Sequence, residues 1–261
     1  MTRKTHLVLG ATGRTGRRIA ARLRLHDAPV RAASRSSRIR FDWSEPDGWD
    51  MVLRNVDVAY VVPPPVPGPV HEFAVRAEAA GVRRLVLLSG RGADGWGDSA
   101  FGQHMRSAEE AVRGSSLGWT VLRASNFAQN FDEDVFHAPL VAGALALPAG
   151  EVPEPFIDVE DLADAAVAVM TEGDRHAGRV YELSGPRSLS RGRSALAEWQ
   201  AAGVWSELQW YCWTGRGRRT ARTSPVPRSI PRMCRPSGGE AAQKSVRVRL
   251  TAHGRARNTM C

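Results

Sequence analysis

The sequence predicts an α/β fold in which a doubly wound parallel sheet carries helices on both faces. Two observations predict it: short apolar runs alternate with helical patterns over residues 5–190, and glycines join the first run to the first helix. Alternation of this kind is typical of parallel strands joined by crossover helices. Residues 191–261 do not continue it, so we expect one domain over residues 1–190, followed by a small, incomplete C-terminal lobe.

Seven apolar runs are predicted to be strands: Thr5–Leu9, Val30–Ala33, Ile39–Asp42, Val58–Val62, Arg84–Ser89, Trp119–Arg123 and Val180–Leu183. The run at residues 58–62 is apolar throughout, as expected of a strand buried on both faces. Helical patterns cover Arg14–Leu25, Val70–Ala80, Gln103–Arg113 and Val159–Thr171, and a short helix follows Pro46. Residues 90–102 are predicted to be a glycine-rich loop, and residues 124–156 to be irregular.

The turn after the first strand is the most informative segment of the chain. Its glycines recur at Gly10, Gly13 and Gly16, with Thr12, Arg14 and Thr15 between them. In this context the first glycine allows the turn, the second a close approach of the backbone to phosphates, and the third tight packing of helix on strand. Free N–H groups and the helix dipole then face the anion. The turn therefore predicts a pyrophosphate site; a plain tight strand–helix turn is the alternative.

The end of the second strand indicates which dinucleotide binds. An NAD site usually has an acidic residue there, but no Asp or Glu lies between Asp27 and Asp42. Ser34, Arg35 and Arg38 stand there instead, and guanidiniums suit a 2′-phosphate. NADP(H) is therefore favoured, with NAD(H) as the weaker alternative, unless both arginines are merely solvated. Asp42 either accepts a hydrogen bond from the adenine amine or caps the next short turn.

Six segments spread over the chain form a recognisable set: Gly-Ala-Thr-Gly-Arg-Thr-Gly at 10–16, Phe-Asp-Trp at 41–43, Gly-Val-Arg-Arg-Leu-Val-Leu-Leu-Ser at 81–89, Gly-Trp-Thr-Val-Leu-Arg at 118–123, Asn-Phe-Ala-Gln-Asn-Phe at 126–131 and Ile-Asp-Val-Glu-Asp-Leu-Ala at 157–163. Together these segments resemble the NmrA-like atypical short-chain dehydrogenases. Ala-Tyr-Val-Val-Pro-Pro-Pro at 59–65 resembles the subgroup of ergot-alkaloid dehydrogenases. The resemblance covers about residues 5–190 and implies a Rossmann domain, NADP(H) binding and a small substrate lobe.

The family contains NADPH-dependent quinone, azo and iminium reductases as well as redox-sensing regulators that bind the cofactor without turnover. The Tyr-x-x-x-Lys pair of the wider superfamily is absent, because none of Tyr60, Tyr181 and Tyr211 has a lysine four residues on. Alcohol oxidation through a tyrosinate is thus disfavoured. We expect a reductase of a small conjugated electrophile, with a non-catalytic NADP(H) sensor as the alternative.

Candidate residues for the reacting end follow the later strands. Ser89 ends strand five, where ligands bind in open α/β sheets, or is a plain turn residue. His104 begins the next helix and is either a proton donor or a solvated side chain. Asn126 and Phe127 follow strand six and are expected to line the nicotinamide pocket, although Phe127 is equally compatible with the core. Pro63 follows strand four and is expected to cover the adenosine half.

The net charge of +9 is concentrated in the last 71 residues. Residues 191–261 hold 14 Lys/Arg against 3 Asp/Glu, whereas residues 1–190 hold 22 against 24. Only 8 of these 71 residues are Ile, Leu, Val or Phe, a fraction at which a charged chain does not fold readily. We interpret this basic tail as the product of a frameshift near residue 190. A nucleic-acid-binding arm is the less favoured alternative.

The remaining features bound the compartment and the partners. No run is long enough to span a membrane and no signal peptide precedes the first strand, so a cytoplasmic protein is expected. Cys212, Cys234 and Cys261 lack metal-ligand spacing, and no metal site is predicted. We expect a small-molecule substrate and a monomer or homodimer.

Overall fold

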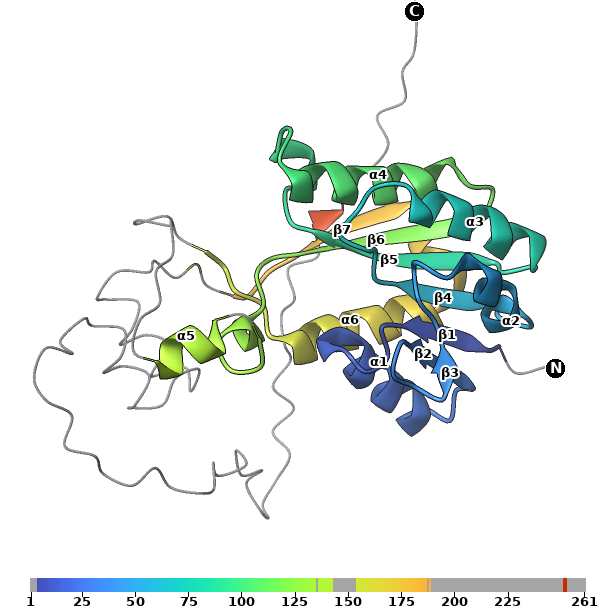
Figure 1. Cartoon of the computed structure of the whole chain (residues 1–261), viewed down its shortest axis with the longest axis horizontal. Coiled ribbons are helices and arrows are strands. Elements are labelled where there is room, and N and C mark those ends of the chain that lie inside the picture. Colours follow the sequence, from blue (N-terminus) through green and yellow to red (C-terminus); the bar gives the residue numbers. More distant parts are fainter. Residues whose placement is uncertain (1–3, 135, 143–153, 187, 189–250, 253–261) are drawn as a thin grey trace, which may run out of the picture.

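A computed structural model describes residues 4–134, 136–142, 154–186, 188 and 251–252 (Figure 1). Within them one sheet has the strand order β3-β2-β1-β4-β5-β6-β7-β8. All neighbouring pairs are parallel except β7 with β8. The strands are β1 (His6–Leu9), β2 (Val30–Ser34), β3 (Ile39–Arg40), β4 (Val58–Val61), β5 (Arg84–Gly90), β6 (Gly118–Ala124), β7 (Arg179–Leu183) and β8 (Thr251–Ala252).

Helices cover both faces of the sheet, as the alternation in the sequence predicts. In Figure 1, α3 and α4 lie over one face and α1 and α6 over the other. The α-helices are α1 (Arg14–Leu25), α2 (Trp49–Leu53), α3 (Pro69–Ala79), α4 (Ala100–Gly114), α5 (His137–Val141) and α6 (Val159–Thr171). Single turns of 3₁₀-helix are η1 (Pro46–Gly48), η2 (Ala93–Gly95), η3 (Ala128–Asn130) and η4 (Gly173–His176). None of the helices in the described part of the chain has the length and hydropathy of a membrane span.

Each face of the sheet has its own apolar core because the central strands are buried on both sides. Leu7, Leu9 and Leu87 point to the face where Trp49 and Phe73 pack from α2 and α3. Alternate residues of the same strands point to the other face, where α1 and α6 contribute side chains such as Ile19, Leu23 and Leu162. The strand order reverses between β1 and β4, so the turn after β1 opens at a topological switch point, where open α/β sheets bind ligands.

The start of α4 differs from the prediction. The helix begins at Ala100, not at Gln103, because the Ser99 hydroxyl caps it by accepting a hydrogen bond from the Gly102 N–H at 3.1 Å. Gly102 therefore belongs to the first helical turn rather than to a loop. His104 consequently lies one turn inside the helix and is 8% exposed, so the solvated alternative for its side chain is wrong.

The described tail residues form one short strand, which the sequence did not predict. Thr251–Ala252 pairs antiparallel with β7, in the register Tyr181↔Ala252 and Glu182↔Thr251. An edge strand such as β7 presents unpaired N–H and C=O groups, and any extended segment can pair with them. Such pairing does not require alternating apolar side chains, which is why the sequence pattern did not predict this strand. Residues 189–250 and 253–261 lie outside the described residues, as do Tyr211 and the three cysteines. The frameshift and nucleic-acid-arm hypotheses concern that part of the chain.

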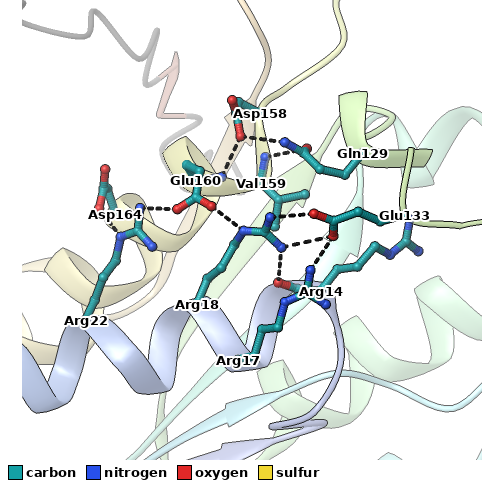
Figure 2. A network of polar contacts seen from close by, with 10 residues as sticks. All are labelled: Arg14, Arg17, Arg18, Arg22, Gln129, Glu133, Asp158, Val159, Glu160 and Asp164. Carbon is teal, nitrogen blue, oxygen red and sulfur yellow. Dashed lines mark hydrogen bonds and ion pairs between the residues drawn. The ribbon is translucent and has the colours of Figure 1, made fainter. Parts of the chain in front are cut away.

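An arginine ladder on α1 ties this helix to α6 and to the segment after β6 (Figure 2). Arg18 donates to Glu133 at 2.8 Å and also pairs with Glu160, while Arg22 pairs with Glu160 at 2.6 Å and with Asp164. Gln129 completes the connection, because its amide nitrogen donates to the Asp158 carboxylate at 2.9 Å and its oxygen accepts from the Val159 N–H at 3.0 Å. Residues 129–133 are therefore fixed against the helix that follows the glycine turn.

We predict that this ladder makes stability depend on pH through Glu133. Its hydrogen bond with Arg18 lowers the pKa of the Glu133 carboxyl below the ordinary 4.5. A lowered pKa in the folded state contributes stability that is present above pH 4.5 and is lost as the pH falls through the lowered value. Glu133→Gln should therefore lower the free energy of unfolding by about 1 kcal/mol at neutral pH, since the side chains are partly exposed.

The measurement is urea denaturation of both proteins between acidic and neutral pH. The difference between wild type and Glu133→Gln should shrink as the solution is acidified below the ordinary carboxyl pKa. Glu110→Gln, on the exposed side of α4, is the control and should change stability little at any pH. A difference that stays constant across the acidic range would contradict the assignment.

Candidate functional site

The turn between β1 and α1 leaves the first amides of the helix open to a ligand. Gly10 has a φ of +65°, which favours glycine, and its carbonyl accepts the Gly13 N–H at 2.8 Å. A Cβ on Gly16 would overlap the Gly10 carbonyl, so only glycine permits this approach of helix to strand. Gly13 is the N-cap residue, no side chain among the described residues caps the helix, and its first turn holds no acidic residue. The positive end of α1 is therefore available to an anion.

A cavity of about 760 Å³ opens beside this turn. Most of the residues that the sequence assigned to the cofactor line it: Gly10, Thr12, Gly13, Arg14, Thr15, Ser34, Arg35, Asp42 and Pro63. Other lining residues come from the segments after β2, β3 and β4: Ser36, Phe41, Trp43, Ser44, Val62, Pro64, Pro65, Val66 and Pro69. The cavity thus follows the carboxyl ends of four adjacent strands, β3, β2, β1 and β4, a place typical of dinucleotide sites.

Hydroxyls and one guanidinium gather at the end of β2. Thr12 donates to the Ser34 hydroxyl at 3.1 Å, and Ser36 donates to Thr12 at 3.2 Å. Arg35 is exposed and lines the cavity, whereas Arg38, also exposed, is not among the lining residues. Of the two arginines suggested for a 2′-phosphate, the structure therefore brings only Arg35 to the cavity.

Two aromatic side chains line this cavity. Phe41 and Trp43 line it, and they pack edge-on against one another with ring centroids 5.0 Å apart. The Trp43 indole donates to the Val62 carbonyl at 3.1 Å, which fixes the aromatic wall to the segment after β4. These residues are flat and largely apolar, so they suit a stacked heterocycle. Their sequence signal, Phe-Asp-Trp, marked the family but not this role.

Asp42 caps the turn that follows it, which is one of the two roles predicted for this residue. Its carboxylate accepts hydrogen bonds from the Ser44 N–H at 3.0 Å and from the Ser44 hydroxyl at 2.8 Å. The bond from the Ser44 backbone is the chief reason why the pKa of Asp42 lies below its ordinary value. Asp42 also lines the cavity, so the adenine role stays a prediction.

A second cavity, of about 360 Å³, adjoins the first at the ends of β5 and β6. The two share Arg14, Leu88 and Phe127. The predicted residues Ser89 and Asn126 line the smaller cavity, together with Gly90, Arg91, Trp96, Phe101, Met105, Ala124, Ser125, Asn130 and Glu154. Trp96 and Phe101 were not predicted from the sequence; their ring centroids lie 4.4 Å apart, and the two residues are 38% and 43% exposed. The only signal for them was two aromatic residues in a polar, glycine-rich segment.

Arg14 stands at the junction of the two cavities. Its guanidinium pairs with Asp134 at 2.5 Å, donates to Asn130, and lies 5.5 Å from the centroid of the Phe127 ring. The first residue of α1 is thereby connected to the segment that lines the smaller cavity. A phosphate bound at the helix N-terminus would lie next to this cation.

The candidate proton donors are both engaged by the protein. Ser89 is 3% exposed, and its hydroxyl donates to Glu109 at 2.7 Å. His104 has Nδ1 2.9 Å from the Ala100 carbonyl, its ring edge against Phe101, and is not among the residues that line either described cavity. Its role in proton transfer stays a prediction, without support from these contacts.

The residues present fit a dinucleotide. The first amides of α1 carry no side-chain cap from the described residues, and the two joined cavities open beside the glycine turn. Among the described residues, no group of His, Cys, Asp or Glu could hold a metal ion.

Comparison with known proteins identifies the family. No protein-family model matches the chain. The chain is 34% identical over 199 residues to the (4-alkanoyl-5-oxo-2,5-dihydrofuran-3-yl)methyl phosphate reductase of Streptomyces griseus, a match that covers 70% of this chain and 69% of that protein. The chain belongs to the NmrA-like atypical short-chain dehydrogenase/reductase family. The resemblance predicted from the sequence motifs is thus confirmed.

Other proteins similar to this NmrA-like chain are named for different reactions. It is 29% identical over 214 residues to the NAD(P)H azoreductase of Xenophilus azovorans, covering 76% of this chain and 73% of that one. It is 31% identical over 211 residues to festuclavine synthase I of Penicillium roqueforti, covering 73% and 71%. An NADPH-dependent quinone oxidoreductase of Escherichia coli, solved with NADPH, shares the fold, with a TM-score of 0.59 at 21% identity over 76% of this chain and 75% of that one.

We predict that Gly13→Val abolishes binding of both NADPH and NADH. A Cβ at Gly13 already lies 3.1 Å from the Gly10 carbonyl oxygen, and the two γ-methyls would occupy the space in front of the α1 amides. Titration of the cofactor fluorescence measures the affinity, and circular dichroism checks the fold. Gly48→Val is the control, since a Cβ there meets nothing within 4 Å. Undiminished affinity in folded Gly13→Val would contradict the site.

Proposed function

We propose that this protein is an NAD(P)H-dependent reductase that transfers a hydride to a small conjugated electrophile of the quinone, azo or iminium type. The observation that carries the proposal is the pair of joined cavities, which meet at Arg14, Leu88 and Phe127 beside the open N-terminus of α1. The activities named for the Streptomyces, Xenophilus and Escherichia relatives support the same class of reaction.

Each cavity has a distinct part in this proposal. The larger cavity holds the adenosine half against Phe41 and Trp43, while the α1 amides and Arg14 bind the pyrophosphate. The smaller cavity takes the nicotinamide and the electrophile, between Phe127 and the aromatic pair Trp96 and Phe101. When bound, the reduced nicotinamide supplies the hydride. The aromatic walls exclude water from one side of the acceptor and hold a planar molecule flat.

The protein's part in the reaction is positioning rather than acid–base catalysis. Tyr60 is fully buried in the core on the α1 and α6 side of the sheet. The Tyr181 hydroxyl lies 2.7 Å from Nδ1 of His176. Neither of these two tyrosines is among the residues that line the two cavities. Reduction of a quinone adds one hydride and one proton, and water at the open rim can provide the proton. That neither Tyr60 nor Tyr181 lines a cavity also favours a second candidate, an NADP(H) sensor that binds the cofactor without turnover.

An assay of NADPH consumption separates the two candidates. We expect oxidation of NADPH in the presence of quinones, azo dyes or iminium compounds, with one equivalent of NADPH consumed per two-electron reduction. Tight NADPH binding without consumption against the whole panel would contradict the reductase and support the sensor. Absence of NADPH binding would contradict both.

We also propose that NADPH is preferred to NADH through Arg35. Arg35 follows β2 and lines the larger cavity together with Ser34 and Ser36, and residues 35–41 contain no carboxylate that could hold a ribose 2′-OH. A charge-assisted contact with a 2′-phosphate contributes about 1.5–3 kcal/mol, or roughly 10- to 150-fold in affinity. Arg38 is not among the residues that line this cavity.

Arg35→Ala should therefore weaken NADPH binding by about 10- to 150-fold and leave NADH binding nearly unchanged. Arg38→Ala is the matched control, because it removes the same charge three residues away and outside the cavity. Dissociation constants for NADPH and NADH, measured by isothermal titration calorimetry on wild type and both variants, test whether Arg35 selects NADPH. Equal losses for NADPH and NADH, or equal effects of the two substitutions, would refute the role of Arg35.

A further inference from the structure

The hydroxyl of Ser89 donates its hydrogen to another residue of the protein. Ser89 lies near the end of β5, lines the smaller cavity and is 3% exposed. Its Oγ donates a hydrogen bond to Oε1 of Glu109, at 2.7 Å. Glu109 comes from α4, which packs over this end of the strand, and is itself only 4% exposed. A serine hydroxyl has one hydrogen to donate and two lone pairs with which to accept.

The surroundings of Glu109 fix the direction of that bond. Arg123 of β6 forms a bidentate pair with the carboxylate, from Nε to Oε1 and from Nη2 to Oε2, both at 2.9 Å. Arg113 adds a third contact, from Nη2 to Oε2 at 2.8 Å. A carboxylate held by two guanidiniums has no hydrogen to give, so Ser89 cannot accept from it.

Arg123 is in turn held in place. Its Nη1 contacts the Asp94 carboxylate at 3.0 Å and the Glu182 carboxylate at 3.1 Å. The hydrogen bonds with Glu109 are the largest cause that raises the pKa of Arg123 above its ordinary value. The Arg123 guanidinium therefore stays charged and paired with Glu109. The Glu109 carboxylate in turn keeps its position as the acceptor of the Ser89 hydrogen bond.

We propose that Ser89 is a hydrogen-bond acceptor in the smaller cavity, and that Glu109 is the positioning residue that fixes this polarity. The bound molecule then presents an N–H or O–H group to the Ser89 oxygen. This inference deepens the proposed function and rests on it for the identity of the cavity. It also excludes Ser89 as the proton donor to the reduced product, since its hydrogen lies on the side of Glu109.

The donor that meets Ser89 can come from two sources, the carboxamide N–H₂ of the nicotinamide or a substituent on the electrophile. For the first, NADPH is compared with its acetylpyridine analogue, in which a methyl ketone replaces the carboxamide and the N–H donor is lost. For the second, aminonaphthoquinone is compared with naphthoquinone, each titrated into the protein–NADP⁺ complex, where no hydride is available. Tryptophan fluorescence reports binding in both titrations.

Wild type should prefer the N–H-bearing member of one pair by about 5- to 10-fold, as expected for one hydrogen bond. Ser89→Ala should reduce that ratio to about 1, while Ser107→Ala, on α4 and outside both cavities, should leave it unchanged. Loss of the ratio for the cofactor pair assigns the donor to the carboxamide, and loss for the quinone pair assigns it to the substrate. Ratios equal in wild type and Ser89→Ala for both pairs would overturn the proposal.

Glu109→Gln tests the positioning role separately. The glutamine oxygen can still accept from Arg123, but its N–H₂ donates to Ser89 and frees the serine hydrogen to point into the cavity. The preference for the N–H-bearing member should then fall to about 1 although Ser89 is intact. A purely structural role for Glu109 would weaken both members equally and leave the ratio as in wild type, which would overturn this part of the proposal.

One control variant and one independent measurement keep the outcomes separable. Glu110→Gln carries the same change on the exposed side of α4 and should retain the wild-type ratio. Should Glu109→Gln not fold, the Ser89→Ala titrations alone decide the acceptor role. Because these are binding ratios, an enzyme that consumes no NADPH would contradict the proposed reductase while leaving the polarity of Ser89 to stand or fall by the titrations.

Discussion

The contact between the start of α1 and the Gly10 carbonyl is the constraint on which the site depends. Gly16 brings the helix against the end of β1 more closely than any side chain would allow, and Gly13 leaves the first amides uncapped. A helix end without partners for its N–H groups is costly unless water or a ligand meets them. A helix N-terminus of this kind is a ready anion-binding site, and the cavities on both sides of the turn agree with the binding of a phosphate there.

The sheet then decides where the two halves of a dinucleotide lie. Because the strand order reverses between β1 and β4, segments that follow β2, β3 and β4 gather on one side of the glycine turn. Segments that follow β5 and β6 gather on the other side. The arginine ladder along α1 holds the segment after β6 to the helix that follows the glycine turn (Figure 2). That segment contributes Phe127, which lines both cavities.

The sequence predicted the fold and the cofactor turn because both depend on local patterns. The apolar runs, the glycine spacing and the cap at Asp158 can each be read within a few residues, and the strands lie within one or two residues of their expected bounds. Interactions between distant residues could not be predicted. Nothing in the chain signals that Glu109 and Arg123 meet under Ser89, or that Arg35 but not Arg38 faces the cavity. His104 shows the same limit. Because Ser99 caps α4, the helix begins three residues earlier than predicted, and the His104 side chain is buried.

The central claim is that the two joined cavities form a single dinucleotide site organised by the N-terminus of α1. A crystal structure of the full chain with NADPH tests it most directly. We expect the pyrophosphate at the amides of residues 13–15, the adenosine between Arg35 and Trp43, and the nicotinamide beside Ser89 and Phe127. A cofactor bound away from the glycine turn, or a nicotinamide that lies outside the smaller cavity, would contradict it.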